Sequence, residues 1–95
     1  MTKYYTYKNK MVFKKTTQNV TNQEILDALE DSPIVKDKTL IGYVTHVQYR
    51  KPNLFYGDIV TNNKEYAKGL IIDTQRMTFD KSNKLKHIVS YLKIQ

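Results

Sequence analysis

The sequence contains no cysteine, and among its 95 residues there are only three glycines and two prolines. Without cysteine, neither a disulfide framework nor a thiolate metal site can form, so packing alone must hold the fold together. The few glycines form no glycine-rich loop to cradle a phosphate, and no serine has the G-x-S-x-G context of a nucleophile elbow. These absences favour an intracellular, cytoplasmic protein without a bound cofactor.

Long apolar runs are also missing. No stretch approaches the roughly 18 apolar residues of a membrane span, and the basic residues near the N-terminus are not followed by an apolar segment. We therefore expect neither a signal peptide nor membrane contact. A chain of this length fits one small domain, residues 1–95, with one modest core.

Groups suited to catalysis or metal binding are sparse. His46 and His87 have no neighbouring ligand at metal spacing. Asp58 and Asp73 could face each other across adjacent strands, but exposed carboxylates close to lysine or arginine are the commoner arrangement. The sequence therefore predicts a non-enzyme that holds no metal.

Charge is the most informative feature of the composition. Sixteen lysines and arginines against nine acidic residues give a net charge of +7, with a pI of about 9.6. Residues 1–20 carry +5, residues 21–37 carry −4 and residues 38–95 carry +6, so acidic side chains gather in one segment. Such a basic balance attracts polyanions such as nucleic acid, or an anionic membrane surface, and it also occurs in proteins that are merely soluble.

Residues 40–60, LIGYVTHVQYRKPNLFYGDIV, combine alternating apolar residues with a turn sequence and so predict a β-hairpin. Lys51-Pro52-Asn53 is the expected turn, because proline presets the backbone angle of an early turn position. Successive strand side chains point to opposite faces. One face of the first strand is thus expected to carry Ile41, Tyr43, Thr45, Val47 and Tyr49, and the other Gly42, Val44, His46, Gln48 and Arg50.

Residues 22–31 are expected to form a helix. Thr21 and Glu24 have the S/T-x-x-E spacing of a capping box, and Val20 is placed to pack on the first turn. Ser32-Pro33 ends the helix, since the residue before proline disfavours the α region. The apolar stripe expected in the core consists of Ile25, Leu26 and Leu29.

The remaining segments predict further strands. Residues 4–15 alternate as one long strand, although Asn9 could instead mark a tight turn that divides them. A single helical turn is expected at residues 65–68, and residues 70–79 form a strand whose slipped apolar phase predicts a bulge. Residues 85–94 fit either a basic amphipathic helix or a strand with Ile88, Leu92 and Ile94 inward. The strand is favoured because consecutive strands tend to pair.

These elements predict an α+β domain, in which one antiparallel sheet of four or five strands carries helix 22–31 on one face. The order is β-α-β-β-β-β, or the same order with a helix as the last element. This order resembles the cystatin-like architecture, but Gln48-Tyr49-Arg50-Lys51-Pro52 replaces the Q-x-V-x-G motif of those inhibitors, so no inhibitor activity is implied. With a helical C-terminus, the order from residue 22 onward would resemble a double-stranded-RNA-binding domain.

The side of the sheet opposite the helix is predicted to be basic and to include a tyrosine. The side under the helix is expected to hold Tyr5, Tyr7, Met11, Phe13, Ile41, Tyr43, Val47, Phe55 and Ile59, with Val12 on the other side. The candidate binding residues are Lys8, Lys10, Lys14, His46, Gln48, Arg50, Lys51, Tyr56 and Arg76. Lysine and arginine would neutralise phosphates while the aromatic ring stacks on bases, which predicts a nucleic-acid-binding module.

A second hypothesis is a small adaptor or inhibitor that docks on an acidic protein. Tyrosine and arginine are common interface anchors, and small basic domains rich in lysine and asparagine are plausible products of phages and other mobile elements. The strand at residues 4–15 could also pair with a second copy through an open edge, which would give a homodimer.

Overall fold

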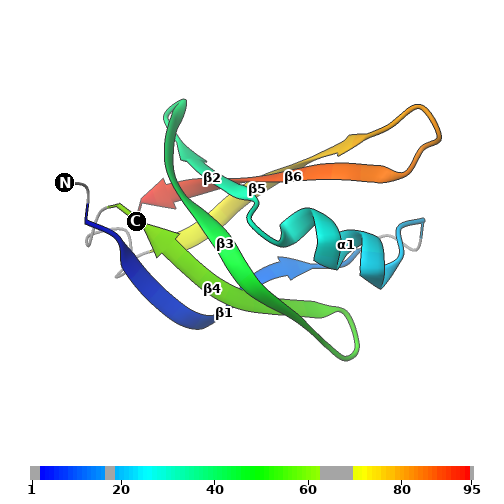
Figure 1. Ribbon diagram of the computed structural model, residues 1–95, viewed down its shortest axis with the longest axis horizontal. Helices are drawn as coiled ribbons and strands as arrows, with labels where there is room; N and C mark the ends of the chain where they lie inside the picture. The colour runs from blue at the N-terminus through cyan, green and yellow to red at the C-terminus, as the bar shows by residue number, and fades with distance from the viewer. Residues whose placement is uncertain (1–2, 17–18, 63–69, 95) are drawn as a thin grey trace.

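The computed structural model describes residues 3–16, 19–62 and 70–94. Within these ranges the chain forms one helix and six strands, shown in Figure 1. The elements are β1 (Tyr5–Lys14), α1 (Asn22–Leu29), β2 (Pro33–Lys36), β3 (Thr39–Arg50), β4 (Leu54–Thr61), β5 (Leu70–Phe79) and β6 (Leu85–Ile94). The α+β class with a single helix is confirmed, and the sheet has six strands where four or five were expected.

All six strands belong to one sheet in the order β1-β4-β3-β2-β6-β5. Neighbouring strands are antiparallel except β2 and β6, which are parallel. The arrangement is therefore not the simple meander of the cystatin-like order. The additional strand is β2, which begins at Pro33, a position where a strand tolerates proline. In the sequence, Ser32-Pro33 indicates only the end of the helix, and no local pattern predicts that the residues after it pair as a strand.

The helix lies between two hairpins. Figure 1 shows α1 flanked by the β5–β6 hairpin on one side and the β3–β4 hairpin on the other, and α1 packs against β6 and β3. Because β2 is only four residues long, β3 and β6 extend well beyond it. The helix covers the opening that this short strand leaves.

The capping box of α1 is present as predicted. Thr21 Oγ1 accepts a hydrogen bond from Glu24 N at 3.1 Å, and Glu24 Oε1 accepts one from Thr21 N at 3.4 Å. Val20 and Ile25 are both buried, as a hydrophobic staple requires. The predicted start of the helix is therefore confirmed.

The helix ends at Leu29, two residues earlier than expected. Asp31 adopts a left-handed backbone conformation with φ 60°. Its N–H donates to Val44 O, and Val44 N donates back to Ser32 O. Pairing with β3 thus takes the chain out of the helix before the proline does.

One core holds the sheet and the helix together. Leu26, expected to be buried, is only partly so, because it lies at the margin of this core. The buried apolar residues that form the core are Val12, Phe13, Val20, Ile25, Leu29, Ile34, Ile41, Val44, Phe55, Ile59 and Ile88.

The predicted faces of β1 are partly wrong. Met11 was expected inward but is 52% exposed, whereas Val12 was expected outward and is buried. Two register shifts in the pairing with β4 explain this: one at Asn9, which has φ 63°, and one between Met11 and Phe13. Each extra residue reverses the alternation that follows it. Asn9 therefore marks a bulge within one strand and does not divide the run into a hairpin.

The predicted faces of β3 are also partly wrong, and this strand too contains a bulge. Tyr43 was expected under the helix but is 40% exposed, while Val44, expected outward, is fully buried. A bulge at His46, with φ 54°, shifts the register between Thr45 and Gln48. The predicted phase is therefore wrong at Tyr43 and Val44, before the bulge. After it, Val47 packs against the core as expected.

The C-terminal segment is a strand, as favoured from the sequence. β6 pairs with β5 across a turn in which Asp80 Oδ1 accepts from Ser82 N and Lys84 N. The bulge expected in residues 70–79 appears as a register shift between Ile72 and Thr74, and Ile88 is buried as predicted. The helical turn expected at 65–68, and the side chains of Asp73, Leu92 and Ile94, lie outside the described residues.

Truncating Leu29 tests whether α1 is part of the core. Because Leu29 is fully buried, Leu29→Ala should lower the free energy of unfolding by about 2 to 5 kcal/mol, measured by denaturant titration. Leu26→Ala, on the same helix but partly buried, is the matched control and should cost clearly less. Equal effects of the two substitutions would contradict this packing of the helix.

Candidate functional site

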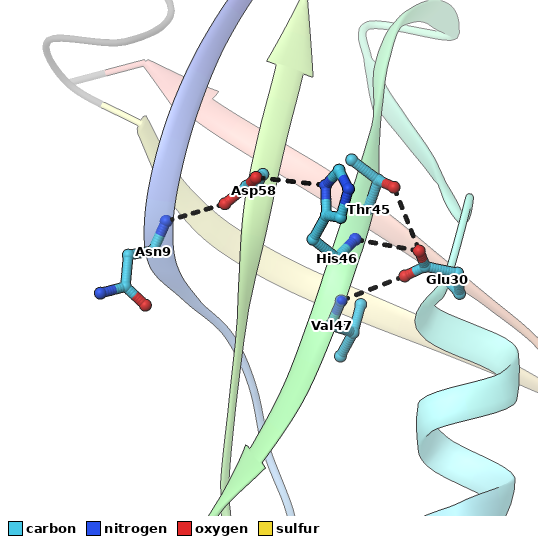
Figure 2. A network of polar contacts seen from close by, with 6 residues as sticks. All are labelled: Asn9, Glu30, Thr45, His46, Val47 and Asp58. Carbon is cyan, nitrogen blue, oxygen red and sulfur yellow. Dashed lines mark hydrogen bonds and ion pairs between the residues drawn. The ribbon is translucent and has the colours of Figure 1, made fainter.

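Asp58, in the middle of β4, contacts the bulges of both neighbouring strands (Figure 2). Its Oδ1 accepts a hydrogen bond from Asn9 N of β1 at 3.0 Å, and its Oδ2 lies 3.3 Å from His46 Nδ1 of β3. The Asp58 side chain is 18% exposed, whereas that of His46 is 76% exposed. One carboxylate on the central strand of this part of the sheet therefore fixes both bulges.

Gly57 makes room for this arrangement. The residue pairs with Lys10, next to the β1 bulge, and it lies opposite the bulged part of β3. A Cβ atom at Gly57 would lie 3.0 Å from Thr45 O and 3.3 Å from Val44 Cγ1. A side chain at this position would push β3 away by a few tenths of an ångström, so glycine suits the close approach beside the bulge.

Glu30, the C-cap of α1, binds the opposite side of the β3 bulge. Its carboxylate accepts hydrogen bonds from His46 N at 2.9 Å, Val47 N at 3.1 Å and Thr45 Oγ1 at 3.1 Å. Partial burial alone would raise the pKa of Glu30, but these hydrogen bonds outweigh it and hold the pKa below the usual value of 4.5. The end of the helix is thereby attached to the bulge.

Glu24 connects the start of α1 to the other hairpin. Its Oε2 accepts a hydrogen bond from Leu85 N at 3.1 Å. This bond, followed by those from Thr21, lowers the pKa of Glu24 from its usual value. Two of the acidic residues that stood out in the sequence therefore bind backbone N–H groups of β3 and β6.

Arg50 lies across β4. Its Cζ is 4.2 Å from the centroid of the Tyr56 ring, and its Nη2 donates to Asn9 Oδ1 at 2.7 Å. The Arg50 side chain therefore starts on β3, stacks on a β4 ring and reaches β1. This contact was not predicted, because it depends on the register of three strands.

The structure brings most of the candidate residues together on three adjacent strands. Lys8 and Lys14 are exposed along β1, and Tyr56 is on β4 between them and the β3 residues. Lys10, expected on the same surface, is exposed but pairs with Gly57, the neighbour of Tyr56, so the bulge at Asn9 places it on the opposite face of the sheet. Arg76, also expected there, lies on β5, at the other end of the strand order. We call the seven clustered residues the basic sheet surface: Lys8, Lys14, His46, Gln48, Arg50, Lys51 and Tyr56.

Sequence reasoning missed Asn9 and Asp58 as partners of this surface. Asn9 was read as a possible turn residue, and Asp58 was considered only as a partner of Asp73. The positive φ that asparagine tolerates was the one local signal for Asn9. Nothing local indicated that Asp58, 49 residues away, would face it.

Neither a metal centre nor a transmembrane helix is found in the part of the chain that the structure describes. No three histidine or acidic side chains there are grouped closely enough to hold a metal ion. The helix there is too short and too polar to cross a bilayer. Comparisons with protein-family models, curated proteins and solved structures give no match to this chain.

Acidification tests the two helix carboxylates. Because the folded-state pKa values of Glu24 and Glu30 are lowered, their stabilisation is present above pH 4.5 and is lost as the pH falls through and below that value. The melting temperature, followed by circular dichroism from pH 7 to pH 3, should therefore drop on the acid side.

Glu30→Gln should lower the melting temperature at pH 7 and flatten its dependence on acid, since an amide cannot titrate. Asp37→Asn is the matched control, because Asp37 is exposed and asparagine tolerates its positive φ. If the Glu30→Gln melting curve runs parallel to that of the parent at every pH, the carboxylate does not stabilise the bulge.

Proposed function

We propose that the protein is a non-enzymatic module that binds nucleic acid through the basic sheet surface. The observation that carries this proposal is the Arg50–Tyr56 stack, which lies on the same face as two exposed lysines of β1, Lys8 and Lys14. Phosphate groups need cations spaced along a strand, and bases need a flat group on which to stack. Both occur here within three hydrogen-bonded strands.

The stack defines how a base would bind. Arg50 covers one face of the Tyr56 ring, so the guanidinium, and not the ring itself, is the group presented to a ligand. Guanidinium planes are established stacking partners for unpaired bases. Single-stranded nucleic acid, whose bases are accessible, fits this surface better than a duplex.

The local charges support the same proposal. The acidic group within this region, Asp58, is mostly buried against Asn9 and His46. Glu30 is bound to the β3 backbone, while the lysines of β1 are exposed. The surface therefore presents its cations to solvent and keeps most of its carboxylate oxygens occupied, which favours a polyanionic ligand.

The direct test is binding to single- and double-stranded oligonucleotides by fluorescence anisotropy across a salt series. Affinity should fall with salt, with a slope of about −0.7 to −0.9 for each phosphate neutralised. Lys14→Glu and Arg50→Glu should each weaken binding and reduce the size of that slope by about 1. The control is Lys81→Glu, which makes the same charge change in the exposed β5–β6 turn.

Two results would end the proposal. One is the absence of salt-dependent binding to any oligonucleotide at micromolar protein. The other is an equal loss with Lys81→Glu and Lys14→Glu, which would mean that net charge alone drives binding.

The edge position of β1 favours protein binding as a second candidate. β1 is a terminal strand of the sheet, so much of one backbone edge can pair with a further strand. Gln75 Nε2 of β5 already donates to Val12 O at 2.8 Å, which occupies part of that edge. Concentration-dependent dimerisation in light scattering, or capture of one acidic protein that Arg50→Glu no longer captures, would favour this candidate.

A further inference from the structure

Two adjoining hollows lie beside the basic sheet surface. The first, of about 380 Å³, is lined by Tyr4, Leu40 and Tyr43 together with Asp31 and Asn62. Its volume falls within the range of small-ligand pockets, and its lining combines apolar walls with a few polar groups, as such pockets do. The second hollow shares Asp31 and Tyr43 with the first, so the two form one groove.

The first hollow is unusually apolar for an exposed place. Tyr4 is 56% exposed, Leu40 63% and Tyr43 40%. They are three of the large apolar side chains that the described part of the chain leaves to solvent. Two tyrosine rings and a leucine offer a surface on which a flat aromatic group loses water and stacks.

The second hollow leads into the basic sheet surface. Lys8 and His46 line it, and both belong to the proposed interface. Asp58 lines it too, but that carboxylate contacts Asn9 N and His46 Nδ1. Lys8 is therefore the cation available to a phosphate, with His46 beside it.

The charged group that lines the first hollow is the carboxylate of Asp31. In the described part of the chain, the Asp31 carboxylate has no hydrogen-bond or ion-pair partner, and only its backbone N–H is bonded. A free carboxylate accepts hydrogen bonds and donates none. It therefore suits a base with an exocyclic amino group and opposes one that presents a carbonyl oxygen there.

We infer that this groove binds one nucleotide of a single strand, with an amino-bearing base, such as cytosine, against Tyr4 and Tyr43 and its phosphate at Lys8. The inference rests on the proposed function and adds to it a base pocket outside the Arg50–Tyr56 stack. The like charge of Asp31 keeps phosphate out of the first hollow, and Lys8 binds it in the second. The groove therefore determines both the type of base that it binds and the orientation of the nucleotide.

The experiment compares three oligonucleotides of equal length: oligo-dC, oligo-dT and an abasic strand with the same phosphates. The parent protein should bind oligo-dC about fivefold more tightly than oligo-dT, the lower end of discrimination by a hydrogen-bonded base contact. Tyr43→Ala should weaken binding to oligo-dC about 5- to 100-fold, as loss of one stacked base predicts. The same substitution should leave the affinity for the abasic strand unchanged.

Two further variants isolate the pocket. Asp31→Asn should abolish the preference for oligo-dC over oligo-dT, and asparagine tolerates the left-handed backbone at this position. Phe79→Ala removes a similarly exposed ring at the end of β5, outside both hollows, and should change none of the three affinities. Thermal melts establish that each variant is folded.

The outcomes separate the two proposals. If the parent binds oligo-dC, oligo-dT and the abasic strand equally, and Tyr43→Ala and Asp31→Asn change nothing, the groove is not a base pocket while the basic sheet surface still binds phosphates. If none of the three strands binds, the proposed function itself is wrong. If Tyr43→Ala also loses binding to the abasic strand, the base pocket is contradicted, because the ring would then support the folded structure and not contact a base.

Discussion

The contact of Asp58 with both neighbouring strands is the constraint on which this half of the molecule depends. β1 has a bulge at Asn9 and β3 has one at His46, and both bulges lie against the same carboxylate. A bulge leaves backbone groups outside the ladder and bends its strand. Asp58 on β4 lies between the bulge of β1 and the bulge of β3, so the two bulges are at the same height in the sheet. In both strands, the side chains that face outward change at this height.

The helix is positioned by the same kind of interaction. Glu30 at its end binds the β3 bulge from the other side, and Glu24 at its start binds β6. These hydrogen bonds connect β3 and β6 beyond the end of the short strand β2, where no ladder joins them. In the sequence, Glu24 and Glu30 look like part of an acidic helix surface. In the fold, both accept hydrogen bonds from backbone N–H groups of the sheet.

Asp58 and Glu30 bind the bulges of β1 and β3, and these bulges influence which side chains the neighbouring surface presents. Before the bulge at His46, Tyr43 faces outward and Val44 inward, and the Tyr43 ring lies in the groove that Lys8 and His46 also line. The bulge at Asn9 places its side chain where Arg50 can reach it across Tyr56. The stack therefore depends on the bulge at Asn9, and the groove adjoins the bulge at His46.

The parts of the fold that depend on local signals can be predicted from the amino-acid sequence. The capping box at Thr21 and Glu24 fixed the start of α1, and the Lys51-Pro52-Asn53 turn fixed the central hairpin. The α+β class follows from these elements. Each signal acts between residues a few positions apart, so it can be read without knowing the partner strands.

The faces of β1 and β3, the strand β2 and the candidate site depend instead on contacts between distant parts of the chain. Alternation predicts a face only while the register is unbroken, and the breaks at Asn9 and His46 depend on Asp58, far from Asn9 in the sequence. β2 is a strand because β3 and β6 lie on either side of it, which four residues cannot signal by themselves. Pairing across long separations in the chain is set by the packing of the whole sheet, and that is where the candidate binding surface is formed.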